Sequence, residues 1–258
     1  MLTYRKTVIT FALILLVVLG IDYLVDVNKW IYAGIIGVFL ILIAWGSKNI
    51  NSGFYMKTVN HGDRNKNSIS LTFDDGPDAQ VTPMILEILK KHQVKATFFV
   101  IGSKAEQLPD LIKQIDKEGH LLGSHSYSHH FFFDLFLSRT MQAEMIRTEN
   151  FIYSCIGKRM KLFRPPYGVT NPPLAKAVRR LQYWAVGWSL KSDDTVIKDE
   201  HALVNRVTSR VQNGDIILFH DNKPWNVRAL DEVIFSLKEK NYQILRLDEL
   251  LNLHAYVY

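Results

Sequence analysis

The chain has 258 residues, of which 48% are hydrophobic and 22% are charged, and its formal net charge is +6. This composition excludes a disordered, collagen-like or coiled-coil chain, and most of it is too polar for a multi-span transporter. The single cysteine, Cys155, excludes a disulfide framework and a zinc cluster of cysteines, and we interpret it as a packing residue. The lysines and arginines are scattered, so we expect no nucleic-acid partner, and no obligate protein partner is predicted.

Two long, uncharged and apolar stretches lie in the first 50 residues, separated by a short polar turn. A membrane-spanning helix needs about 20 apolar residues. Two tryptophans flank the second stretch, as at membrane interfaces. We therefore predict a membrane anchor over residues 1–50, with two transmembrane helices at about 7–25 and 30–47, and a linker over residues 51–66.

Each stretch has an alternative interpretation. The first could be a cleavable signal peptide, although residues 21–24 lack the small side chains of a cleavage site, and the second could be a buried helix. Arg5 and Lys6 favour a cytoplasmic N-terminus, and a hairpin would return the chain to the cytoplasm, in agreement with Lys48 and Lys57. If the first stretch does not span, the rest of the chain lies outside. The predicted location is a membrane, the bacterial cell membrane, on either side.

From about residue 68 onward, short β-branched or aromatic runs alternate with amphipathic runs. The predicted strands are 68–73, 96–102, 120–124, 162–164, 182–188, 215–220 and 243–245. The predicted helices are 82–91, 108–118, 139–156, 173–181, 201–211, 230–240 and 247–253. Alternating βα units indicate an α/β fold with a parallel sheet and helices outside, either a barrel or a doubly wound sheet.

Polar residues follow several of these strands at the point where each strand ends. They are residues 74–77, His125 with His129 and His130, residues 164–168, Asp193 with Asp194, and His220 with Asp221. The carboxyl ends of parallel strands meet at one edge, where the functional site of such folds lies. We therefore expect these side chains to converge on one rim.

The acidic pair and the histidine pair suit a metal site. Neighbouring residues at a strand end point to opposite sides, so one of Asp74 and Asp75 can hold a metal while the other faces a substrate. The alternative is an ordinary turn. His125 and His129 are four residues apart, which on a helical turn places both imidazoles on one face, although two surface histidines are the alternative. Two histidines and one carboxylate form a common open zinc set.

Three further residues could serve an acyl-transfer reaction. Arg164 has a planar fork suited to pair with Asp74, unless it is a surface arginine. The two prolines after it stiffen the turn, so that the backbone N–H of Tyr167 is held toward a developing oxyanion. His220 ends a buried strand, where it is either a satisfied core residue or an acid or base.

Four motifs resemble, in their order, those of the polysaccharide deacetylases, the NodB-like domains of carbohydrate esterase family 4. They are residues 72–77 (TFDDGP), 125–129 (HSYSH), 164–168 (RPPYG) and 218–221 (LFHD). The similarity covers about residues 65–250. It implies a distorted (β/α)7 barrel over residues 67–254, and the membrane hairpin predicted from the apolar stretches precedes this barrel. It also implies a metal-dependent hydrolase that removes N-acetyl groups from amino sugars of a polysaccharide such as peptidoglycan or a chitin-like glycan.

The resemblance also implies the roles of the metal ligands and the base. Asp75, His125 and His129 would bind a divalent metal, Zn²⁺ or a similar ion such as Co²⁺. Asp74 would be the general base that deprotonates the metal-bound water, and Arg164 would orient it.

The remaining carried-over roles concern the substrate. The metal and the Tyr167 N–H would stabilise the oxyanion, and His220 would protonate the leaving amine. Leu218 would help to line the pocket for the acetyl methyl, with Tyr167 beside the substrate. Two other functions stay open: a deacylase of a lipid-linked sugar at the membrane, and a catalytically silent carbohydrate-binding protein.

Two segments need separate mention. In residues 188–195, Lys191 stands where the family often has an aspartate that would support the histidine acid, with Asp193 or Asp194 as its replacement. Thr195 stands where the family has a tryptophan that walls the pocket. Residues 130–136 (HFFFDLF) are either a hydrophobic cluster that caps a helix or an apolar lip beside the site that touches a lipid tail or a sugar face.

Overall fold

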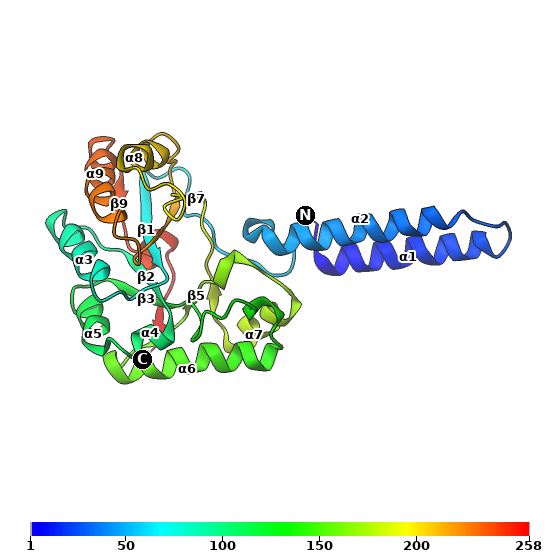
Figure 1. Ribbon diagram of the computed structural model, residues 1–258, viewed down its shortest axis with the longest axis horizontal. Coiled ribbons are helices and arrows are strands. Elements are labelled where there is room, and N and C mark those ends of the chain that lie inside the picture. The colour runs from blue at the N-terminus through cyan, green and yellow to red at the C-terminus, as the bar shows by residue number, and fades with distance from the viewer. Residues whose placement is uncertain (1, 258) are drawn as a thin grey trace.

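A curled parallel sheet forms the centre of the C-terminal part of the computed structural model, which describes residues 2–257 (Figure 1). Its strands are β1 (Ser68–Asp74), β2 (Thr97–Val100), β3 (Leu121–Ser124), β5 (Leu162–Phe163), β6 (Trp184–Ala185), β7 (Leu190–Lys191), β8 (Ile216–His220) and β9 (Gln243–Ile244). They lie in the order β6-β5-β3-β2-β1-β8-β7, with β9 beside β1, and all their pairings are parallel. Within the described residues β6 and β7 do not pair with each other, so the barrel is incomplete.

Helices cover the outside of this sheet, as Figure 1 shows. They are α3 (Val81–Lys91), α4 (Gly102–Ala105), α5 (Pro109–Lys117), α6 (Ser138–Ile156), α7 (Pro172–Leu181), α8 (Glu200–Thr208) and α9 (Asn226–Glu239). Each presents apolar residues to the core at helical spacing; in α5 these are Leu111, Ile112 and Ile115. Because it is covered on both faces, β1 is buried along its whole length.

The inside of the curl is filled from the C-terminal end of the chain. Leu247 and Leu250 of α10 (Leu247–Leu251) pack in one apolar cluster with Phe99, Val186 and Ile216 from the sheet and the segments beside it. A small antiparallel pair, β4 (Arg159–Met160) with β10 (Tyr256–Val257), lies beside α6. Three short 3₁₀ helices complete the structure: η1 (Ile50–Ser52), η2 (Phe133–Leu135) and η3 (Pro166–Gly168).

The predicted alternation of strands and helices is confirmed, and the differences lie where tertiary contacts decide. Of the strand predicted over 182–188, only Trp184–Ala185 pairs as a strand. Leu190–Lys191, which lies outside every predicted strand, pairs with β8. The helix predicted to begin at residue 230 begins at Asn226.

The N-terminal residues form two antiparallel helices that project from the domain (Figure 1). They are α1 (Tyr4–Asp22) and α2 (Lys29–Lys48), and both are long and apolar enough to cross a membrane. Only 6% of the apolar window in each is buried, which does not fit a core helix. At their base, Thr170 N–H donates to the carbonyl oxygen of Ser47 (3.0 Å), and Ser47 Oγ donates to the carbonyl oxygen of Thr170 (2.8 Å).

A buried histidine predicts how the fold responds to acid. His120 precedes β3, and its Nδ1 lies 3.1 Å from the N–H of Ala96, which can donate to it. Burial, reinforced by the charges of Lys95 and Arg246, lowers the pKa of His120 to about 4 from an ordinary 6.5. Between these two values the unfolded chain binds a proton that the folded chain does not, so stability is lost as pH falls through this range.

We therefore expect the free energy of unfolding to fall by up to about 3 kcal/mol from this group as pH drops from 6.5 to 4. Urea unfolding of the full chain in detergent, at several pH values, measures it. His120→Gln keeps an acceptor for Ala96 but does not titrate, so its pH dependence should be shallower by that amount. Equal slopes for the two proteins would contradict the assignment.

Candidate active site

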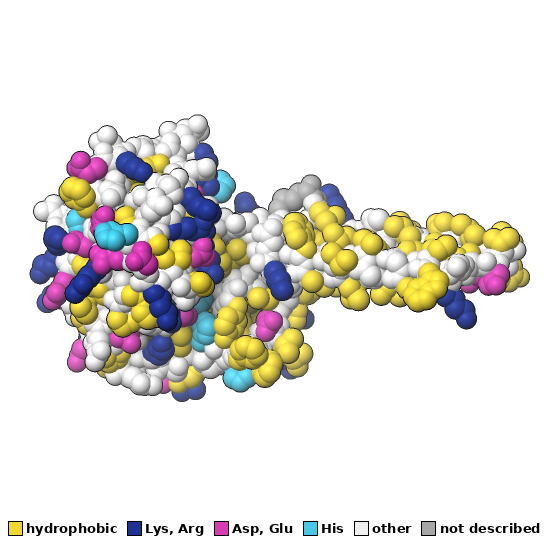
Figure 2. Space-filling view, turned by 45° about the horizontal axis from the view of Figure 1, so that its top comes forward, with side chains coloured by type: hydrophobic (Ala, Val, Ile, Leu, Met, Phe, Trp, Pro, Cys, Tyr) yellow, Lys and Arg dark blue, Asp and Glu magenta, His cyan; other side chains and the backbone are white. Residues whose placement is uncertain are grey.

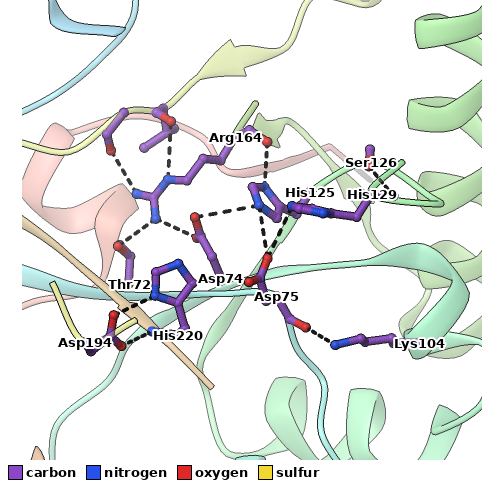
Figure 3. Close-up of polar contacts among 12 residues, drawn as sticks. Thr72, Asp74, Asp75, Lys104, His125, Ser126, His129, Arg164, Asp194 and His220 are labelled. Atoms are coloured by element: carbon purple, nitrogen blue, oxygen red, sulfur yellow. Dashed lines mark hydrogen bonds and ion pairs between the residues drawn. The ribbon is translucent and has the colours of Figure 1, made fainter. Parts of the chain in front are cut away.

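The loops that follow β1, β3, β5 and β8 contribute to the lining of one cavity of about 360 Å³. Figure 3 shows how Asp74, Asp75, His125, His129 and His220 lie close together at this site. The cavity is lined by Asp74, Asp75, His125, His129, Pro165, Tyr167, Gly168, Trp188, Lys191, Thr195, Leu218 and His220. The structure thus brings together residues from all four motifs at the carboxyl ends of the strands. Arg164 and Asp194 lie behind the wall of this cavity, fully buried.

Asp75, His125 and His129 lie close enough together to share one metal ion. One donor atom from each lies within 4.8 Å of the others. Asp75 Oδ1 is 3.6 Å from His125 Nε2 and 3.3 Å from His129 Nε2. The Nδ1–H of His125 donates to the carbonyl oxygen of Arg164 (2.8 Å). The Nε2 atom is then unprotonated, and its lone pair can ligate a metal. Two imidazoles and one carboxylate fit a divalent ion with an open position.

The charges around Asp75 favour its ionised form. Burial alone would raise the pKa of Asp75, but neighbouring positive charges outweigh burial and hold this pKa below its ordinary value. They come from His125, His220, His129 and Lys104. Asp75 is therefore a carboxylate at neutral pH, which is the form that ligates a metal.

The two histidines converge through a tight turn, and the helical turn assumed from their spacing is wrong. Residues 125–130 are not helical, and Ser126 (φ 64°) and His129 (φ 46°) adopt left-handed backbone conformations. The N–H of His129 donates to Ser126 Oγ (3.0 Å), and the Glu144 carboxylate accepts from the two N–H groups between them (3.1 and 2.7 Å). These hydrogen bonds hold the turn that aims both imidazoles at Asp75.

Asp74 points to the other side of the strand end, where a buried arginine holds it. Arg164 Nη1 lies 2.7 Å from Asp74 Oδ1, and also donates to Thr72 Oγ1 (2.9 Å), while Nη2 donates to the carbonyl oxygen of Gly187 (2.8 Å). Burial lowers the pKa of Arg164 from its ordinary value, and the carboxylate of Asp74 counteracts this. The second oxygen of Asp74 faces the metal set, 3.9 Å from His125 Nε2.

Tyr167 also lines the cavity and has a left-handed backbone conformation (φ 59°). Its backbone N–H makes no hydrogen bond within the described residues, and its ring lies 4.8 Å from that of His129. Gly168 follows with φ +67°, and a Cβ there would come within 2.5 Å of the Trp188 ring. The close approach of Trp188 therefore requires glycine at this position. Leu218 is a further apolar residue of the cavity lining.

His220 is held by an aspartate. Its Nδ1 lies 2.7 Å from Asp194 Oδ1, its backbone N–H donates to Asp194 Oδ2 (2.7 Å), and the Asn226 side-chain amide also donates to Oδ2. Burial alone would lower the pKa of His220. The hydrogen bond and charge of Asp194, with the charges of Asp74 and Asp75, raise this pKa above its ordinary value. Nε2 is left free for proton transfer into the cavity.

The support of His220 comes from one of the two replacements that the sequence left open. Lys191, at the expected aspartate position, lines the cavity instead. Of the two replacements left open, Asp193 pairs with Arg206 (2.6 Å), and Asp194 turns inward to His220. Asp193 has a left-handed backbone conformation (φ 63°) at the point where the side chains of these two adjacent aspartates take different directions.

Comparison with known proteins agrees with this geometry. The family model described as polysaccharide deacetylase matches residues 61–186. A peptidoglycan-N-acetylglucosamine deacetylase of Bacillus cereus is 34% identical over 196 residues, which cover 72% of this chain and 89% of the relative. The chain belongs to the polysaccharide deacetylase family.

Two further comparisons show the extent of the similarity. The structure of the Bc1960 peptidoglycan N-acetylglucosamine deacetylase matches this polysaccharide deacetylase with a TM-score of 0.73 at 33% identity, over 77% of this chain and 94% of the other. The predicted NodB-like fold is thereby confirmed. The peptidoglycan-N-acetylglucosamine deacetylase PgdA of Listeria monocytogenes is 35% identical over 184 residues, or 70% of this chain. The alignment spans only 38% of that relative's length.

In this polysaccharide deacetylase, residues 130–136 have features of both structures considered from the sequence, a hydrophobic cluster that caps a helix and an exposed apolar lip. Phe133 is buried in a cluster with Met141 and Met145, as a helix-capping cluster requires. Phe131 and Leu135 are 73% and 74% exposed, as an apolar lip requires.

Sequence reasoning missed three residues of the site. Thr72 supports Arg164, Trp188 packs on Gly168, and Asn226 holds Asp194. Thr72 lies in a recognised motif, which was a usable signal. Asn226 lies in a segment for which the sequence predicts no structure, so no local pattern marks it.

Proposed function

We propose that this polysaccharide deacetylase is a metal-dependent hydrolase that removes N-acetyl groups from amino-sugar residues of a glycan such as peptidoglycan. The observation that carries the proposal is the convergence on one cavity of a two-histidine, one-carboxylate set, a buried base and a supported histidine. The relatives named as peptidoglycan deacetylases support the same reaction.

Asp75, His125 and His129 are the proposed metal ligands. When bound, the metal activates the attacking water and polarises the amide carbonyl. Two imidazole nitrogens and one carboxylate oxygen suit Zn²⁺, and Co²⁺ accepts the same donors. The hydrogen bond of His125 to the carbonyl oxygen of Arg164 fixes the tautomer that ligation needs.

The protein's own groups then handle the protons and the developing charge. Asp74 accepts the proton of the attacking water, and Arg164 fixes its orientation and keeps it ionised. The unengaged N–H of Tyr167 donates to the oxyanion of the tetrahedral intermediate.

Collapse of that intermediate requires an acid, because the amine of an amide is a poor leaving group. His220, whose pKa Asp194 raises, donates this proton from Nε2. Leu218 contacts the methyl group of the acyl chain.

The helical hairpin is the proposed membrane anchor. Both helices are apolar over a membrane-spanning length, and most of their surface lies outside the protein core (Figure 2). The basic residues Arg5, Lys6 and Lys48 at the domain end favour the cytoplasmic side for the domain, but a domain of this length is translocated largely regardless of such charges. A reporter fused after the last residue, active only on one side of the membrane, tests that orientation.

Acetate release tests the proposed reaction. We expect the full chain, purified with Zn²⁺, to release acetate from N-acetylglucosamine oligosaccharides or peptidoglycan. A chelator should abolish release, and added Zn²⁺ should restore it. Asp75→Ala is the matched variant, and it should lose both metal and activity. Release that survives both the chelator and Asp75→Ala would refute the proposed site, whereas metal and glycan binding without release would favour the carbohydrate-binding alternative.

A further inference from the structure

An exposed apolar segment, residues 131–137, borders the active site; we name it the lip. Its exposed side chains are Phe131 (73%), Phe132 (53%), Leu135 (74%) and Leu137 (75%). Between them Phe133 is 2% exposed and fixes the segment to the core. Four large apolar side chains exposed within seven residues form a patch of the kind that marks an interaction surface.

The lip is attached to the base of the helical hairpin. Asn171 Nδ2 donates to the carbonyl oxygen of Asp134 within the lip (2.6 Å). The preceding residue, Thr170, exchanges hydrogen bonds with Ser47 at the end of α2, and its hydroxyl donates to the carbonyl oxygen of Gly46 (3.3 Å). Two adjacent residues therefore link the lip to the point where α2 enters the domain. Figure 2 shows hydrophobic side chains gathered on the side of the domain beside that base.

The lip also adjoins the segment that carries the metal histidines. It begins two residues after His129, and the Phe131 ring lies 6.4 Å from that of Tyr167. Tyr167 Oη in turn donates to the carbonyl oxygen of His129 (3.4 Å). The lip is therefore one edge of the cavity mouth, on the side that carries the hairpin.

A basic cavity lies on the same side. It has a volume of about 420 Å³ and is lined by Tyr4, Tyr55, Met56, Lys57, Pro172, Ala175, Lys176, Val178 and Arg179. No acidic side chain of the described residues lines it. Three cations at the level where α1 begins attract anionic lipid headgroups, and tyrosines favour that interface. The positive charge of this cavity and the apolar side chains of the lip therefore both favour binding to a lipid bilayer.

We propose that the lip docks on the surface of the bilayer that the hairpin spans, so that the mouth of the cavity faces the membrane. This proposal rests on the proposed anchor and on the proposed deacetylase. If the lip docks in this way, the enzyme prefers one class of substrate. Amino-sugar glycans attached to a membrane lipid are deacetylated faster than the same glycans free in solution. The alternative partner of the lip is a second copy of the chain. In that case the lip would not contact the bilayer.

Depth measurements on the full chain test the docking. Single cysteines at Leu135, at Leu13 in α1 and at Phe235 in α9 carry a fluorescent label in a Cys155→Ser background. The protein is reconstituted into nanodiscs of phosphatidylcholine and phosphatidylglycerol that contain headgroup- or chain-nitroxide lipids. Phe235 is the matched control, since it is 58% exposed and α9 lies at the end of the domain away from the hairpin (Figure 1).

We expect quenching at Leu13 and Leu135 and none at Phe235. Quenching at Leu13 alone would overturn the docked lip while leaving the anchor intact. No quenching at Leu13 would overturn the anchor, and with it the docking, but would leave the deacetylase proposal untouched.

Activity tests the consequence for substrate choice. The probes are an N-acetylglucosamine oligosaccharide coupled to phosphatidylethanolamine in the same nanodiscs, and the uncoupled oligosaccharide. The double variant Leu135→Ser/Leu137→Ser should lose about tenfold in rate on the coupled probe, because two apolar anchors leave the interface. It should retain its rate on the free probe, and Phe235→Ser should match the original chain on both. Equal losses on both probes, or no loss on the coupled one, would overturn the proposal.

Discussion

Replacing Asp74 with asparagine is expected to lower kcat by about 10²–10⁴-fold, the usual contribution of a general base, while metal binding persists. The reason is geometric. Asp74 is not one of the three clustered donors, Asp75, His125 and His129. Its Oδ1 is engaged by Arg164 (2.7 Å), and its Oδ2 faces the donor set, 3.9 Å from His125 Nε2. Asparagine keeps the shape and an acceptor oxygen for Arg164, but it cannot take a proton from water.

The matched comparison is Asp75→Asn, one residue away, which should lose bound metal as well as activity. Metal content and acetate release are measured on the same preparations. Folding is checked by thermal unfolding, because Arg164 is fully buried and a weakened ion pair there destabilises the chain. Arg164 retains Thr72 and the carbonyl oxygen of Gly187 as acceptors, so we expect a folded variant. Loss of metal in Asp74→Asn would instead make Asp74 a ligand.

The sheet could be predicted from the sequence because its central strands carry local signals. β8 is apolar up to its last residue, and β1 alternates the apolar Ile69, Leu71 and Phe73 with serine and threonine and is buried at every position. The two-residue strand β7 carries no such signal, and of the strand predicted over 182–188 only the two residues of β6 form. The extent of both strands depends on the pairing edges of β5 and β8, which only the assembled sheet provides.

The same distinction separates the parts of the site. Asp74 and His220 could be placed because each ends a recognisable strand, and parallel strands bring their ends together. The partner of His220 could not be chosen, since Asp193 and Asp194 are equivalent in sequence and only the loop conformation separates them. The contact of Thr170 with Ser47 joins residues 123 positions apart, so the position of the lip beside the hairpin could not be predicted from the sequence either.

Replacing Asp194 with asparagine is expected to shift the alkaline limb of the pH dependence of kcat/KM to lower pH. In the intact site the hydrogen bond and the charge of Asp194 raise the pKa of His220 above its ordinary value, against the effect of burial. The leaving amine needs a protonated His220, so activity falls as pH rises through that pKa. Asparagine removes the negative charge, and burial then acts on His220 without the opposing effect of Asp194, so the pKa of His220 should fall.

The adjacent residue supplies the control, because Asp193→Asn removes an equal charge that pairs with Arg206 and does not touch His220. Its alkaline limb should stay in place. A structural role for Asp194 alone would lower the rate at every pH without moving the limb, so the position of the limb separates the two roles. An unmoved limb in Asp194→Asn, or an equal shift in Asp193→Asn, would show that His220 is not the acid whose protonation Asp194 maintains.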